Sequence, residues 1–127
     1  MTEAALLARV CDSATDEERW ASMLVLADWL EEQGDARCEA WRLMVADQVR
    51  VVREKPMFYG DTCVFYLHLT LPDEFIEINS YGWWYFYPTV EAALLAAAAA
   101  FIRAKAAGWA PEWPDDSGGL SIEPAKL

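Results

Sequence analysis

The fold is decided by residues 26–43, LADWLEEQGDARCEAWRL, which predict the end of one helix, a tight corner and the start of a second helix. Gly34 follows the first helical part, and glycine readily takes the left-handed conformation that closes a helix C-terminus. Asp35 comes next, where a carboxylate can accept the free N–H groups at the start of the following helix. A corner this short predicts that the two helices form an antiparallel hairpin.

Three pieces of this region form a recognisable signature: ADWLEE at 27–32, GD at 34–35 and RxExxRL at 37–43. The signature resembles that of a bacterial module, the repeat-companion domain family, and the resemblance covers about residues 18–44. Two positions depart from the pattern, Ala36 where the family often has proline and Trp41 where a smaller apolar residue is usual. The resemblance implies no biochemical activity; it implies a helical module that accompanies other domains.

The composition limits the class of protein. The chain has 127 residues, of which 55% are hydrophobic, and this is enough for one folded domain. The formal net charge is −11, which argues against direct binding of nucleic acid because phosphate contacts need clustered cations. The basic cluster of Arg50, Arg53 and Lys55 falls near the end of a predicted helix, where cations complement the helix dipole.

Cysteine and histidine usage indicates a cytoplasmic protein without a metal site. Cys11, Cys38 and Cys63 form no C-x-x-C motif and are expected to be reduced thiols. The apolar run at 92–102 is too short to cross a membrane, and the acidic start of the chain does not resemble a signal peptide. With the single histidine His68, the sequence predicts neither a metal site nor a cofactor.

Residues 1–55 are expected to be helical. Thr2 can cap a short first helix, and the capping box TDEE begins a second helix over 15–33. Apolar residues at three- and four-residue spacing predict a third helix over 36–53, which Pro56 prevents from continuing.

Residues 56–108 change to the two-residue period that is typical of strands. The elements predicted there are strands over 62–71, 75–78 and 83–87, then a helix over 90–107 that Thr89 caps and Gly108 closes. Residues 109–127 are rich in Pro, Gly and Asp and are expected to be irregular. The whole pattern predicts one α+β domain: an N-terminal helical hairpin with a short leading helix, then a three-stranded antiparallel sheet and a C-terminal helix.

Five aromatic residues follow one another in the last predicted strand: Trp83, Trp84, Tyr85, Phe86 and Tyr87. Successive side chains of a strand point to opposite faces, so both faces carry rings. The rings can be core, if helices cover both faces, or one alternating set can form a surface for a protein partner or a homodimer. A stacking platform for a sugar or a base is the third alternative. We expect one set to be buried and the other to be the contact surface of a monomer or homodimer.

Asp28 lies at the edge of the apolar stripe of the second helix, and the sequence therefore predicts that it is partly buried. Its expected partner is Arg42, or failing that Arg37, on the following helix. Loss of one member of a buried ion pair leaves the other unpaired, so Asp28→Ala is expected to lower the free energy of unfolding by a few kcal/mol.

The sequence shows no catalytic constellation. The serines lack a G-x-S-x-G setting, His68 lies within a strand, and neighbouring carboxylates do not face each other across a cleft. We therefore expect a non-catalytic, acidic interaction module that binds a protein partner through an aromatic patch. The first alternative is an inhibitor or immunity-type protein, including a nucleic-acid mimic, that blocks a basic site on its partner. The second alternative is a small-molecule or carbohydrate binder.

Overall fold

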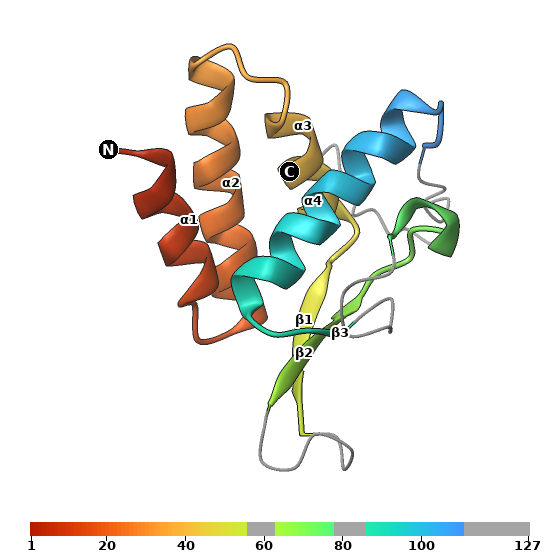
Figure 1. Ribbon diagram of the computed structural model, residues 1–127. Coiled ribbons are helices and arrows are strands. Elements are labelled where there is room, and N and C mark those ends of the chain that lie inside the picture. The colour runs from red at the N-terminus through yellow and green to blue at the C-terminus, as the bar shows by residue number, and fades with distance from the viewer. Residues whose placement is uncertain (56–62, 78–85, 111–127) are drawn as a thin grey trace, which may run out of the picture.

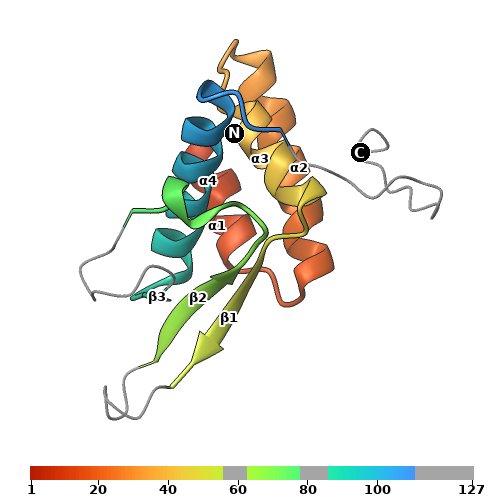
Figure 2. The same ribbon diagram turned by 90° about the vertical axis from the view of Figure 1, so that its right-hand side faces the viewer.

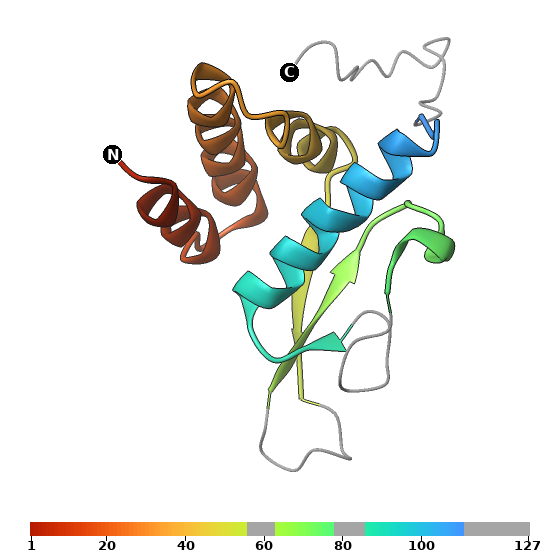
Figure 3. The same ribbon diagram turned by 45° about the horizontal axis from the view of Figure 1, so that its top comes forward.

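The computed structural model describes residues 1–55, 63–77 and 86–110, and it has the predicted α+β architecture (Figure 1). Its elements are α1 (Glu3–Cys11), α2 (Asp16–Glu32), α3 (Cys38–Ala46), β1 (Arg50–Glu54), β2 (Val64–His68), the 3-10 helix η2 (Asp73–Phe75), β3 (Phe86–Tyr87) and α4 (Val90–Ala106). The first three helices stand together on one side of the molecule and the sheet lies on the other (Figure 3). Helix α4 runs between these two parts.

Helix α4 joins the helical part to the sheet, because it packs against α1 and α3 as well as against all three strands. Several of its buried positions are small: Ala93, Ala97, Ala100 and Ala104 are fully buried. Small side chains let neighbouring elements approach the helix closely, whereas the fully buried Phe101 fills a larger space in the core. The hydrophobic core is therefore continuous from the helices to the sheet.

The sheet is antiparallel, with the strand order β1–β2–β3. Val51 of β1 lies opposite Leu67 of β2, and Phe65 of β2 lies opposite Tyr87 of β3. These side chains belong to the core or pack against it, so this face of the sheet is the one that α4 covers. The far end of the β1–β2 pair extends beyond the helices (Figure 2).

The ends of the helices follow the signals in the sequence. Thr2, Thr15 and Thr89 each accept, on the side-chain oxygen, the backbone N–H three residues later at 3.0 to 3.1 Å. Gly34 and Gly108 have φ angles of +72° and +90°, the left-handed conformation that closes α2 and α4. These local interactions set the start of three helices and the end of two.

The corner between α2 and α3 is longer than predicted. The side chain of Asp35 accepts the N–H of Arg37 at 2.9 Å, and α3 begins only after this turn. Asp35 is therefore not the N-cap of α3, whose cap residue is Arg37 without a side-chain hydrogen bond. The Arg37 guanidinium donates to the carboxylates of Asp35 and Glu3, which lowers the pKa of Asp35 and ties α1 to the corner.

The helix predicted over 36–53 is wrong in its second half, because α3 ends at Ala46 and the chain then forms β1. Val49 and Val52 lie three residues apart, which fits one face of a helix. Valine is also β-branched, however, and its stiff side chain packs well in a strand. The spacing of these two valines therefore does not distinguish a helix from a strand.

Two tertiary contacts fix the turn between α3 and β1. The Nε1 of Trp20 donates to the carbonyl oxygen of Val49 at 2.8 Å, and the Asp47 carboxylate accepts both the N–H and the hydroxyl of Thr70. Gln48, between these anchors, has a φ of +54°, which is uncommon for a residue with a side chain. Burial raises the pKa of Asp47, and the two bonds from Thr70 oppose that rise.

The strand predicted over 75–78 is wrong in the part that the structure describes. The chain forms η2 up to Phe75, and Ile76 enters the hydrophobic core. Arg103 of α4 donates from Nε and Nη2 to the carbonyl oxygen of Phe75 at 3.2 and 2.7 Å, which holds this segment on the helix instead of in the sheet. Of the strand predicted over 83–87, β3 contains the last two residues, and residues 83–85 lie outside the described part.

After Gly108 the chain turns back onto α4. The N–H of Trp109 donates to the carbonyl oxygen of Ala104 at 2.9 Å, and its ring lies edge-on to Phe101 with the ring centroids 5.9 Å apart. From residue 111 onward, the segment predicted to be irregular lies outside the described residues.

Among the described residues, Arg19 of α2 is the charged side chain that is buried, with 8% of its surface exposed. Its Nε donates to the carbonyl oxygen of Val10 at 3.0 Å, and its Nη2 donates to those of Cys11 and Ser13 at 3.3 and 3.1 Å. Carbonyls at a helix C-terminus have no donors within the helix. Arg19 supplies these donors and thereby joins the end of α1 to the start of α2.

We predict that Ala97→Leu lowers the free energy of unfolding by about 1–3 kcal/mol, because the close packing around α4 has no room for a larger side chain. Urea denaturation measures the change. Ala106→Leu is the matched control, since Ala106 is exposed on the same helix and its replacement is expected to leave the midpoint nearly unchanged. An Ala97→Leu variant as stable as this control would contradict the close packing.

Candidate functional site

The sheet has a second face, which points away from α4. Strand alternation and register place seven residues on it: Arg50, Val52 and Glu54 from β1, Val64, Tyr66 and His68 from β2, and Phe86 from β3. We call this set the outer sheet face. None of the helices in the described part packs against it in the way that α4 packs against the inner face.

The centre of the outer sheet face is a row of three apolar side chains across the strands. Val52 lies opposite Tyr66, and Tyr66 lies opposite Phe86. The rings of Tyr66 and Phe86 are tilted against each other with their centroids 5.6 Å apart, a favourable geometry for an aromatic pair. All three side chains are half-buried, so the row combines mutual packing with exposed apolar surface.

One end of the outer sheet face is polar. Arg50 Nη2 lies 2.8 Å from Nδ1 of His68, and the His68 ring lies 5.3 Å from the ring of Tyr66. A guanidinium can only donate, so Nδ1 is the acceptor and the ring proton belongs on Nε2. The Arg50 side chain is thereby oriented next to the apolar row, and both polar groups are exposed.

The other end of this face is closed. Val64, which pairs with Glu54, is fully buried but does not belong to the main hydrophobic core. The accessible part of the outer sheet face is therefore the apolar row together with Arg50 and His68.

The predicted aromatic patch is only partly described. Phe86 is half-buried on the outer sheet face, whereas Tyr87 points to the core with 5% of its surface exposed, and burial raises the pKa of its hydroxyl. These two residues divide between the faces as strand alternation requires. Trp83, Trp84 and Tyr85 lie outside the described residues.

The predicted pair of Asp28 and Arg42 is present, with 2.8 Å between Oδ1 and Nη2, but it is not buried. The Asp28 side chain is 71% exposed, so the prediction of partial burial is wrong. The same Arg42 nitrogen also bonds to Glu31 at 2.8 Å, and the two carboxylates raise the pKa of the guanidinium, Glu31 more strongly. The pair lies on the solvent-exposed edge of the α2–α3 hairpin. Asp28 is next to the apolar stripe of α2 in sequence angle, but its side chain extends into water.

The sequence does not predict the outer sheet face as a group of neighbouring residues. It places Arg50 and Val52 in the helix predicted over 36–53, so it does not predict that they alternate along a strand next to β2. Tyr66 and His68 had a usable signal, because the period of two over 62–71 puts them on one face. Only the register between β1 and β2 shows that these four residues are neighbours.

The described ranges hold no group of three or more His, Cys, Asp or Glu side chains that could bind a metal ion. No helix in those ranges combines the length and the apolar character that a bilayer-spanning segment needs.

Comparison with protein-family models, with curated proteins and with solved structures found no match. The resemblance of residues 18–44 to the repeat-companion domain therefore stays a prediction.

We predict that Asp28→Ala lowers the free energy of unfolding by less than about 1 kcal/mol, because exposed ion pairs contribute little and Arg42 keeps Glu31 as a partner. Urea denaturation at low and high salt measures this, and salt is expected to shrink the difference further. A loss of several kcal/mol would contradict the exposed position of the pair.

Proposed function

We propose that the protein is a non-catalytic interaction module that binds a protein partner through its outer sheet face. The observation that carries the proposal is the cross-strand row of Val52, Tyr66 and Phe86, which is half-buried and leaves part of its apolar surface exposed on the face opposite α4. Apolar and aromatic side chains that gather on one face and stay partly exposed commonly mark interaction sites.

The chemistry of this face suits protein binding. Tyr and Arg are enriched among the residues that dominate binding energy at protein interfaces, and here Tyr66 and Arg50 are diagonal neighbours on one face of β1 and β2. Tyr66 is already held by Phe86 and His68, so little rotational freedom is lost when a partner covers it.

The charges around β1 indicate the chemistry of the partner. Other cations in the described part, such as Arg37, Arg42 and Lys105, are bonded to carboxylates of the chain itself. On the outer sheet face, Arg50 instead contacts a histidine nitrogen. We infer a partner surface with an apolar centre for the row and an acidic side chain at its rim for Arg50.

The repeat-companion resemblance supports this proposal to the extent that it implies a module that accompanies other domains. An inhibitor that uses the net charge of −11 to block a basic site is the alternative, and so is a small-molecule or carbohydrate binder. The salt dependence of the affinity separates the charge-driven inhibitor from the proposed module. The affinity of an interface that depends on many charges falls steeply as the salt concentration rises, whereas that of an apolar interface does not.

We predict that Tyr66→Ser and Phe86→Ser each weaken binding of the partner by about tenfold or more, as truncation of a central interface residue does. The partner is first identified by cross-linking from cells, and the binary affinity is then measured with purified proteins by calorimetry. Self-association is measured in parallel by sedimentation, since a second copy of the chain is one candidate partner.

The matched control is Val25→Ser, which removes an exposed apolar side chain from α2 and is expected to leave the affinity unchanged. Thermal unfolding of each variant separates a lost contact from a lost fold. If Tyr66→Ser and Phe86→Ser bind like the wild type, or if they unfold, the row is not an interface and the proposal is wrong.

A further inference from the structure

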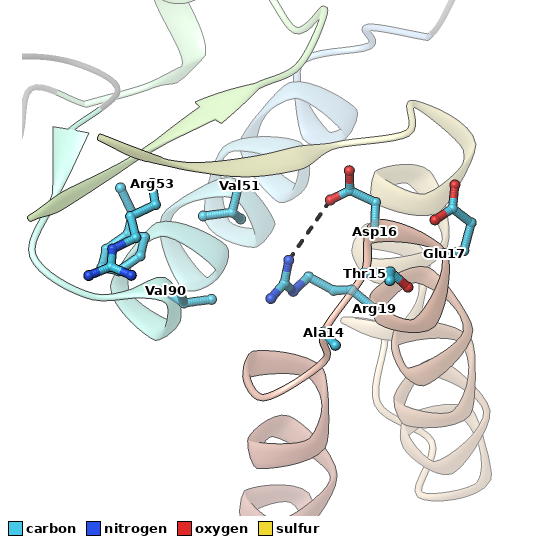
Figure 4. Close-up of a pocket in the computed structure, with 9 residues that line it drawn as sticks. Ala14, Thr15, Asp16, Glu17, Arg19, Val51, Arg53 and Val90 are labelled. Carbon is cyan, nitrogen blue, oxygen red and sulfur yellow. Dashed lines mark ion pairs between the residues drawn. The ribbon is translucent and has the colours of Figure 1, made fainter. Parts of the chain in front are cut away.

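A cavity of about 430 Å³ that is open to solvent lies on the opposite side of β1 from the outer sheet face (Figure 4). It is formed where the starts of α2 and α4 approach the inner face of β1 and β2. Its volume is in the range of sites that hold small molecules. The proposed partner surface does not include any of the residues that line it.

Part of the cavity wall is apolar. Val51 and Phe65 contribute side chains from the sheet, and Val90 contributes one from the first turn of α4. Val51, Phe65 and Val90 are only partly buried against the core, so each leaves apolar surface toward the cavity. This wall can hold the hydrophobic part of a ligand.

Arg19 provides a buried cation at the cavity. Its side chain is nine-tenths buried, and Nε and Nη2 are both bonded to carbonyl oxygens at the end of α1. Within the described residues, Nη1 has only Asp16 at 3.9 Å, which is longer than a hydrogen bond. Figure 4 shows this end of the guanidinium directed into the space between α2 and the sheet. Nη1 therefore keeps an ion pair with Asp16 but makes no hydrogen bond within the described residues, so it can donate one to an anionic oxygen in the cavity.

Arg53 provides a second cation in the cavity wall. Its Nε and Nη2 lie 3.3 and 3.2 Å from the sulfur of Cys63, which is a weak acceptor. No carboxylate of the described ranges pairs with this guanidinium. Figure 4 shows Arg53 and Asp16 toward opposite ends of the cavity with Arg19 between them.

The remaining charged groups in the wall are Asp16 and Glu17, in the first turn of α2. Asp16 lies on the side of Arg19 away from Arg53, and Glu17 lies further out in the same direction (Figure 4). The two ends of the cavity therefore differ in charge, and the end near Arg53 and Val90 favours an anion.

We propose that this cavity binds a small organic carboxylate with an apolar body. The carboxylate accepts hydrogen bonds from Arg19 Nη1 and from Arg53, and the apolar body lies against Val51, Phe65 and Val90. This site is independent of the proposed partner surface, because Arg53 and Val51 point to the opposite face of β1 from Arg50 and Val52.

Titration of the isotope-labelled protein with phenylacetate, followed by backbone amide NMR spectra, tests the proposal. The expected result is saturable shifts of the amides at 15–19, 51–53 and 90, with a dissociation constant of about 1 mM, ordinary for a ligand of this size. Phenylacetamide lacks the charge and acetate lacks the apolar body, so the affinity for each is expected to be at least about tenfold lower than that for phenylacetate. Equal shifts with phenylacetamide, or no saturable shift with phenylacetate, would overturn the proposal.

Arg53→Gln is expected to weaken phenylacetate binding at least about tenfold, because one of two charge-assisted contacts is lost. Arg50→Gln is the matched control on the same strand, and its affinity for phenylacetate is expected to equal that of the wild type. Both residues are exposed, and the amide spectra report whether each variant is folded. If the two variants bind phenylacetate equally well, the carboxylate is not held by Arg53 and the site is wrongly assigned.

Discussion

The close packing of α4 is the constraint on which the rest of the structure depends. Its fully buried alanines let α1, α3 and the sheet approach one helix from different directions, and a larger side chain at any of these positions would separate them. A single helix covers one face of a three-stranded sheet. The opposite face then carries the half-buried row of Val52, Tyr66 and Phe86, which the proposed function uses.

Strand β1 connects the two surfaces for which we propose binding. Its residues alternate, so Arg50 and Val52 belong to the outer sheet face while Val51 and Arg53 line the cavity at the start of α2. The chain has a net charge of −11, but Arg50 and Arg53 place one positive charge on each face of β1. Both surfaces thus combine apolar side chains with an arginine of β1. The outer sheet face is open enough to contact a protein, whereas the cavity has the size for a small molecule.

Much of the fold could be predicted because its signals are local. The threonine caps, the left-handed Gly34 and the two-residue period of β2 depend on neighbouring residues, and all three are present in the structure. The errors arose where distant contacts decide: Trp20 and Thr70 hold the turn that starts β1, and α4 draws the chain near Ile76 out of the sheet. The exposed position of Asp28 and the pairing of Arg50 with His68 likewise depend on packing and register, which no single stretch of sequence contains.

The most direct test of this account is the accessibility of the two sheet faces in the free protein. A soluble paramagnetic agent broadens the NMR signals of protons near the surface, and side-chain signals of Tyr66 and Phe86 can be compared with those of Leu67 and Tyr87. The account predicts strong broadening for Tyr66 and Phe86 and little for Leu67 and Tyr87, which are 4% and 5% exposed. Equal protection of Tyr66 and Tyr87 would contradict an open outer sheet face.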